Sequence, residues 1–249
     1  MKILLLDLET TPIVSHTWGI WQQNVGINQI VSDPYVLCYA AKWLEDKEVF
    51  FRSTQHEAKK TMLQSIWELL DEADAVVHYN GTKFDIPWLN GEFAREGISP
   101  PSPYKEIDLL TTVKRRFRFP SNKLEYVVKA LGVGKKIKTE GHDLWVGCMA
   151  GDKGSWKKMK EYNIQDVAIL ESLYLNIRPW IKGHANHGLY DTSESQVCPT
   201  CGSTDLHKRG TTATLSSIYQ RYRCKGCGHW SRGTVILNKK LNKVVSISL

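Results

Sequence analysis

The 249-residue sequence predicts an α/β protein in which helices flank a mixed sheet, followed by a small cysteine-containing module. Three observations lead to this prediction. Apolar segments of strand length alternate with segments whose apolar residues recur at helical spacing. A polar, glycine-containing stretch comes next, and two C-x2-C pairs follow it. We therefore expect a domain over residues 1–182, a linker over 183–196, and a cysteine module with a basic tail over 197–249.

The composition is that of a globular protein in water. Its hydrophobic fraction is 42% and its charged fraction is 24%. No apolar run approaches the roughly 20 residues that a membrane-spanning helix needs. The apolar run at the N-terminus is too short for a secretory signal and lacks a small-residue cleavage site. We expect no membrane partner and a cytoplasmic, reducing location.

The formal net charge of +7 is concentrated near the C-terminus. Residues 183–249 contain nine Lys and Arg against three Asp and Glu, whereas residues 1–182 contain 24 against 23. A basic excess confined to one region favours binding to a polyanion such as nucleic acid. If the four cysteines of this region bind zinc as thiolates, the excess falls by about two charges.

The first part of the chain is predicted to form a strand, a hairpin, a helix and a strand. Residues 2–9 (KILLLDLE) are nearly all apolar, which is typical of a strand covered on both faces. A polar turn joins residues 35–44 and 48–52 into a predicted hairpin. Apolar residues recur at helical spacing within 56–72, and residues 75–80 (AVVHYN) fit a short buried strand.

Helices dominate the region that follows. A turn at Gly81 comes first, and Pro87 is suited to open the next helix. A proline-rich break lies at residues 99–103. Three further helices are predicted over residues 109–117, 123–131 and 156–177. This order fits a mixed sheet of the ribonuclease H-like kind, although other α/β folds share it.

Residues 13–34 have little periodicity and are predicted to form a long loop. The loop contains Trp18 and Trp21. These side chains either pack against the protein or stack on unpaired bases, as aromatic residues do in single-strand channels.

Two acidic residues lie two apart in the first predicted strand. Asp7 and Glu9 therefore point to the same face of the sheet. Carboxylates this close repel each other, and one tends to become protonated unless a cation holds both. The pair thus indicates a metal site, or alternatively an exposed strand end with two solvated acids.

Two later segments carry further candidates. Asp85 lies where a strand turns into a helix, and it could serve there simply as a helix N-cap. Tyr162 and Asp166 are four residues apart in a helical segment and so share one helix face. The simple alternative for that pair is a half-buried tyrosine and a surface acid.

Together these motifs resemble a known superfamily. D-x-E on the first strand, N-x-x-x-F-D at a strand-to-helix turn and Y-x-x-x-D on a late helix resemble, in that order, the DEDD (DnaQ-like) 3′–5′ exonucleases. Tyr162 is typical of the DEDDy branch, because the histidine branch would have His where this chain has Glu161. Asp108 and residues 121–136 also resemble the proofreading domain of family B DNA polymerases, and the likeness spans residues 1 to about 180.

The resemblance implies a ribonuclease H-like domain that hydrolyses DNA phosphodiesters with two Mg²⁺ or Mn²⁺ ions, at single-stranded or frayed 3′ ends. It implies metal ligands at Asp7, Glu9, Asp85 and Asp166, a water-positioning role for Tyr162, and substrate contacts at Thr10, Asn80 and Phe84. Two alternatives stay open. The substrate could be RNA, or the scaffold could be a non-catalytic module that docks nucleic acid or protein.

The cysteine module is the most specific local motif. Cys198, Cys201, Cys224 and Cys227 form two C-x2-C pairs, which resemble a zinc ribbon with one structural Zn²⁺. Disulfides are disfavoured in a reducing compartment. Basic and aromatic residues alternate through 218–233, which we expect to form a strand. This pattern suits DNA binding, although zinc ribbons also dock protein partners.

Overall fold

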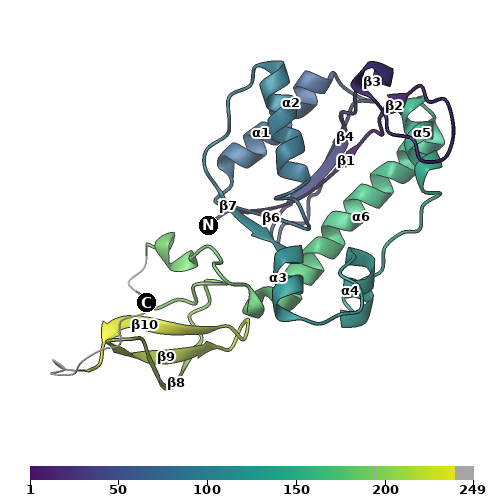
Figure 1. Ribbon diagram of the computed structural model, residues 1–249. Coiled ribbons are helices and arrows are strands. Elements are labelled where there is room, and N and C mark those ends of the chain that lie inside the picture. Colours follow the sequence, from purple (N-terminus) through teal and green to yellow (C-terminus); the bar gives the residue numbers. More distant parts are fainter. Residues whose placement is uncertain (193–194, 239–249) are drawn as a thin grey trace. The chain divides into compact units, whose positions relative to one another are not determined.

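The computed structural model describes residues 1–192 and 195–238 (Figure 1). It divides into two compact units, one over Lys2–Tyr174 and a second that begins at Leu175. Three lysines of the predicted basic tail and two residues of the predicted linker lie outside the described residues. They are Lys239, Lys240 and Lys243, and residues 193–194.

The first unit is built on a five-stranded sheet with the strand order β5-β4-β1-β6-β7. Its strands are β1 (Ile3–Thr10), β4 (Val36–Trp43), β5 (Phe50–Ser53), β6 (Ala75–His78) and β7 (Lys105–Asp108). β1 pairs antiparallel with β4 and parallel with β6. The predicted mixed sheet is confirmed, and β1 lies at its centre.

Helices cover both faces of this sheet (Figure 1). They are α1 (Lys59–Glu72), α2 (Asp85–Glu96), α3 (Leu109–Arg116), α4 (Leu124–Leu131), α5 (His142–Met149) and α6 (Lys153–Ile177). Leu4, Leu6 and Leu8 of β1 pack against α1 and α2. On the other face, Leu37 and Cys38 of β4 pack against α5 and α6. The even-numbered residues of β1 are therefore committed to one core, which turns its odd-numbered residues toward the other layer.

The structure contains elements that the sequence analysis did not predict. β7 has the sequence KEID, of which only Ile107 is buried, so it lacks the apolar pattern of a strand. α5 was also not predicted. It contains Gly147, where an added Cβ would lie 2.1 Å from Ser155 Oγ, so the close approach of α5 to α6 requires glycine there. α2 begins at Asp85, two residues before the predicted start at Pro87, which lies in the first turn where its missing N–H costs nothing.

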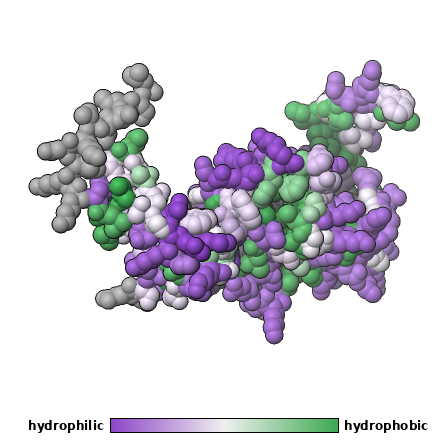
Figure 2. Space-filling model, turned by 90° about the horizontal axis from the view of Figure 1, so that it is seen from below, coloured by the Kyte–Doolittle hydropathy of each residue, from purple (hydrophilic) through white to green (hydrophobic). Residues whose placement is uncertain are grey.

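Residues 14–32 form an arm that extends the hairpin of β1 and β4. Within it, β2 (Val14–Ser15) pairs antiparallel with β3 (Ile30–Ser32), after the short helix η1 (Ile27–Gln29). The loop prediction is thus wrong at the base of the arm. Trp18 is 98% exposed and Trp21 is 84% exposed, so neither packs against the described protein. Figure 2 shows one face of the molecule, on which hydrophobic residues form patches among hydrophilic ones. Base stacking by the two tryptophans stays a prediction.

The second unit contains an antiparallel sheet with the strand order β10-β9-β8. Its elements are η2 (Arg178–Trp180), η3 (His187–Leu189), β8 (Leu206–Ala213), β9 (Ile218–Cys224) and β10 (Trp230–Ile236). The single strand predicted over 218–233 is wrong, because a turn separates β9 from β10 and Gly228 adopts a φ of 79° in it. Part of the segment predicted as a linker is ordered, since the His187 backbone N–H donates to the Pro199 carbonyl at 2.8 Å.

Of the helices formed by the described residues, none combines the length and the apolar character that crossing a bilayer requires.

A glycine pair tests the packing at the turn after β6. An added Cβ at Gly81 would lie 2.4 Å from Cγ of the buried His78 ring. We expect Gly81→Ala to lower the free energy of unfolding by about 1–3 kcal/mol, the usual cost of overpacking. At Gly91 in α2 nothing lies within 4 Å of the added atom. Gly91→Ala should therefore raise the free energy of unfolding by about 1 kcal/mol, because alanine favours a helix interior more than glycine does. Urea denaturation of both variants checks the pair; equal shifts would contradict this description of the turn.

Candidate active site

Three carboxylates from two distant parts of the sequence meet at one end of β1. Because Leu6 and Leu8 face α1 and α2, Asp7 and Glu9 point to the opposite layer, where α6 supplies Asp166. One carboxylate oxygen from each of these acids lies within 4.8 Å of the others. The predicted convergence of the D-x-E strand and the Y-x-x-x-D helix is therefore present in the structure.

Asp85 lies beside this group and is tied to β1. It is the first residue of α2, and its Oδ1 accepts a hydrogen bond from the backbone N–H of Leu8 at 3.1 Å. That N–H is available because β1 pairs with β6 only as far as Leu5. The N-cap of α2 is Phe84, with no side-chain capping bond, so Asp85 does not have the capping role considered from the sequence.

Asn163, which the sequence motifs did not indicate, holds Asp7 in place. This side chain is fully buried on α6. Its Nδ2 donates to Asp7 Oδ2 at 2.7 Å and to the Asp7 carbonyl at 3.3 Å. Its position three residues before Asp166, on the same helix face, is the sequence signal that could have revealed it.

Lys136 was also missed. It comes from the segment between α4 and α5, and its Nζ lies 2.6 Å from Asp166 Oδ2. The same ammonium donates to the Tyr162 hydroxyl at 3.2 Å and lies 5.1 Å from the centre of that ring. Trp145 of α5 packs edge-on against Tyr162 at a centroid distance of 6.2 Å. The tyrosine is therefore fixed between a cation and an aromatic ring.

Burial makes the charged forms of the acids costly. It raises the pKa of Asp7 well above its usual range, with further contributions from Glu9, Asp85 and Asp166. Burial, followed by repulsion from Asp166, raises the pKa of Glu9 to about 8. Burial raises the pKa of Asp85 to about 6. Burial also raises the pKa of Asp166, although Lys136 opposes this. The site therefore favours protonation within the cluster unless a cation offsets the charge of its carboxylates.

A divalent cation fits this donor set. Oδ1 of Asp166 is buried and has no hydrogen-bond partner among the described residues. A buried polar atom without a partner is costly, and an ion at the cluster would satisfy it. The donors are all hard carboxylate oxygens, which suit Mg²⁺ and Mn²⁺.

The predicted substrate contacts lie on β1 and in the turn that leads into α2. Thr10 ends β1, directly after a break in the register with β4. Asn80 adopts a left-handed backbone with a φ of 70°, and its N–H donates to the Asp108 carboxylate at 3.0 Å. Phe84 precedes Asp85 and is 39% exposed. Their contacts with substrate stay predictions.

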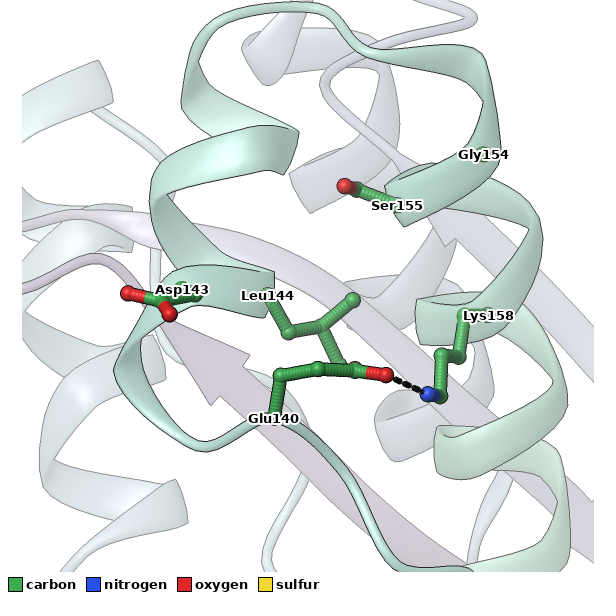
Figure 3. A pocket seen from close by; sticks show the side chains of 6 residues that line it. All are labelled: Glu140, Asp143, Leu144, Gly154, Ser155 and Lys158. Atoms are coloured by element: carbon green, nitrogen blue, oxygen red, sulfur yellow. Dashed lines mark hydrogen bonds and ion pairs between the residues drawn. The ribbon is translucent and has the colours of Figure 1, made fainter.

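A surface hollow of ≈280 Å³ lies where α5 meets the start of α6 (Figure 3). It is lined by Glu140, Asp143, Leu144, Gly154, Ser155 and Lys158. An ion pair between Lys158 and Glu140 crosses it. None of the lining residues is a predicted site residue, so the hollow is distinct from the acidic cluster.

The four predicted cysteines form a second cluster, in the second unit. Their sulfur atoms all lie within 4.8 Å of one another. Cys198 Sγ lies 3.7 Å from Cys227 Sγ, and Cys201 Sγ lies 3.6 Å from Cys224 Sγ. These distances exclude disulfides, and they match the spacing of about 3.8 Å that tetrahedral Zn–S bonds of 2.3 Å impose. The cluster is consistent with a zinc ribbon.

Comparison with known proteins identifies the fold. A family profile described as the RNase H superfamily matches residues 4–177. The chain belongs to the RNase H superfamily. Its superfamily and its acidic cluster together indicate a metal-dependent nuclease. No curated protein matches the sequence.

Among solved structures, the chain is similar to the family B DNA polymerase from the hyperthermophilic archaeon Pyrobaculum calidifontis. The sequence identity is 16% and the TM-score is 0.56. The match covers 72% of this chain but 24% of the polymerase. This likeness shows a shared fold, and the predicted ribonuclease H-like architecture is confirmed.

Asn163→Ala tests whether the amide positions Asp7. Loss of a hydrogen bond to a metal ligand typically costs 10–100-fold in metal affinity or activity. We expect the Mn²⁺ concentration for half-maximal nuclease activity to rise by about tenfold. Ser172→Ala, which removes an exposed hydroxyl from the same helix, should leave it unchanged. An unaltered Mn²⁺ requirement in Asn163→Ala would show that the amide serves packing alone.

Metal analysis tests the cysteine cluster. We expect one zinc ion per chain, absent from Cys198→Ser and Cys224→Ser but retained by Cys148→Ala, which changes a buried cysteine outside the cluster. Without zinc the second unit should become protease-sensitive, because metal binding supplies about 10–16 kcal/mol of folding free energy in comparable peptides. Zinc retention by the cluster variants would contradict the ligand assignment.

Proposed function

We propose that the protein is a metal-dependent 3′–5′ exonuclease of the DEDDy type that hydrolyses DNA at single-stranded or frayed 3′ ends. The observation that carries this proposal is the meeting of Asp7, Glu9 and Asp166, with Tyr162 one helical turn from Asp166. These residues occupy the motif positions of the superfamily that the sequence resembles.

Asp7, Glu9 and Asp166 would hold the metal ions, with Asp85 supporting them from α2. Two Mg²⁺ or Mn²⁺ ions supply activation of a water molecule and stabilisation of the leaving oxygen in phosphodiester hydrolysis. Ion binding would also offset the burial and the mutual repulsion that raise the pKa values of Asp7 and Glu9.

The protein's own residues orient the reactants. Burial, together with the charge of Asp166, raises the pKa of Tyr162, so its hydroxyl stays protonated at neutral pH. Lys136 donates to the oxygen of that hydroxyl and pairs with Asp166, so it holds the phenol beside this acid, where Tyr162 would position a water molecule. Asp166 and Tyr162 raise the pKa of Lys136, although burial opposes this, so the ammonium keeps its charge beside the cluster.

Two observations bear on the choice of substrate. Similarity to a DNA polymerase favours DNA, and the 3′–5′ direction rests on the motif resemblance. RNA remains the second candidate, because the acidic cluster acts on the phosphodiester that both polymers share. A purely docking function is disfavoured by the buried Asp166 Oδ1, which has no hydrogen-bond partner among the described residues.

Hydrolysis of a 5′-labelled single-stranded DNA oligonucleotide tests the proposal. With Mn²⁺ or Mg²⁺ we expect a ladder of products shortened from the 3′ end. Asp7→Ala and Asp166→Ala should each lower the rate by more than about 100-fold, because each removes a ligand of the ions that activate water. Glu161→Gln, an exposed charge change on α6 beside Tyr162, should keep the parental rate. Parental rates in the aspartate variants would refute the site.

A matched RNA oligonucleotide separates the alternatives in the same assay. Faster loss of RNA than of DNA would favour the ribonuclease alternative. Products shortened from the 5′ end would overturn the direction. Tight binding without turnover under either metal would favour a docking module.

A further inference from the structure

We propose that the outer face of the β8–β9–β10 sheet is a binding site for a single nucleic-acid strand. This arginine face consists of Arg209, Arg221, Arg223, Arg232, Tyr219 and Trp230. It lies wholly within the second unit, and its ligand binding can be measured without hydrolysis.

The strand register places these side chains together. His207 of β8 and Trp230 of β10 both lie opposite Arg223 of β9. One step along the same face, Arg232 lies opposite Arg221. Directly opposed residues in antiparallel strands project from the same face, as do residues two apart in one strand. Two adjacent rows across the sheet therefore carry arginine and aromatic side chains.

The burial pattern of β9 shows that this face is open. Arg221 and Arg223 are exposed, whereas their neighbours Tyr222 and Cys224 are buried. The central strand thus directs a metal-cluster cysteine inward and its arginines outward. The cysteine cluster fixes the strand that carries the arginines.

A hollow on this face offers room for a ligand. Its volume is ≈570 Å³, and its lining includes His207, Lys208, Arg209, Arg221, Arg223 and Trp230. A neighbouring hollow of ≈320 Å³ shares His207, Arg209 and Arg223 with it. Two adjoining hollows with shared basic walls fit an extended polyanion better than a single small anion.

The positive charge of this face is uncompensated. β8, β9 and β10 contain no Asp or Glu. Among the described residues, none of the four arginines of the face forms an ion pair, and the nearby Asp205 pairs instead with Lys225 at 3.4 Å. Guanidinium groups bind phosphate through paired N–H donors, so this face is suited to a phosphodiester backbone.

Aromatic rings hold two of the guanidinium groups. Arg221 lies 5.0 Å from the centre of the Trp230 ring, and Arg232 lies 4.0 Å from that of Tyr219. Trp230 is 48% exposed, which leaves surface on which a base can stack. Base stacking requires unpaired bases, so aromatic rings between phosphate-binding arginines favour a single strand over a duplex. An acidic peptide would pair with the arginine side chains but would have no base to stack on the Trp230 ring.

Binding of a fluorescent single-stranded DNA oligonucleotide to the full chain tests the proposal. Anisotropy is measured without added Mg²⁺ or Mn²⁺ and without chelator, over a range of salt concentrations. We expect Arg221→Gln combined with Arg223→Gln to weaken binding at least tenfold and to reduce the slope of log K against log[salt] by about 1.4, which is about 0.7 for each lost phosphate contact. Trp230→Ala should weaken binding about fivefold or more with an unchanged slope, because it removes stacking and no charge.

Two variants serve as controls. Lys47→Gln combined with Lys129→Gln removes the same charge from the first unit and should leave affinity nearly unchanged. Arg221→Lys combined with Arg223→Lys keeps the charge but loses the paired donors, so it should weaken binding while preserving the slope. Retained zinc content in each variant shows that the second unit is folded.

Three results would overturn the proposal. The first is parental affinity and salt slope in the double glutamine variant. The second is tighter binding to duplex DNA than to the single strand. The third is equal competition by polyglutamate together with no effect of Trp230→Ala, which would point to an acidic protein partner. Because the assay involves no hydrolysis, loss of the exonuclease proposal would leave these outcomes unaffected.

Discussion

Burial of four carboxylates at the end of β1 is the constraint on which the site of the first unit depends. Three of the four acids are held by donors from different parts of the fold: Leu8 on β1 donates to Asp85, Asn163 on α6 donates to Asp7, and Lys136 pairs with Asp166. None of these donors neutralises the group as a whole, because the pKa values remain raised. The fold thus assembles the acids and leaves their charge for a cation to balance.

The sheet explains why this site lies where it does. β1 loses its parallel neighbour β6 after Leu5, while its antiparallel neighbour β4 continues alongside as far as Thr10. The strand is therefore held on one edge and free on the other over the segment that carries the acids. Asp85 fills that free edge with its hydrogen bond to Leu8, so the first turn of α2 replaces a strand.

The sequence predicted those parts of the site whose signal is local. Spacing alone placed Asp7 with Glu9 on a strand face, and Tyr162 with Asp166 on a helix face. The cysteine pairs are local in the same sense. Asn163 shares a helix face with Asp166, but its contact with Asp7 spans 156 residues, so its spacing from Asp166 indicates a place near the site and not its partner.

The differences between the predicted and the observed fold lie where the sequence has no local signal. β7 was missed because its residues are mostly polar and it becomes a strand only through pairing with β6. For Trp18 and Trp21 the sequence left packing and base stacking open, and the structure exposes both side chains. The two tryptophans lie between β2 and β3, which pair with each other. Strands of two and three residues are too short to be recognised from a sequence pattern.

The buried acids also carry a cost in stability. Burial and neighbouring acids disfavour the charged forms of Asp7 and Glu9, so neither carboxylate is the side chain that would stabilise the first unit most by itself. A cation bound at the cluster would offset this cost. The folding stability of the first unit is therefore coupled to metal binding at the end of β1.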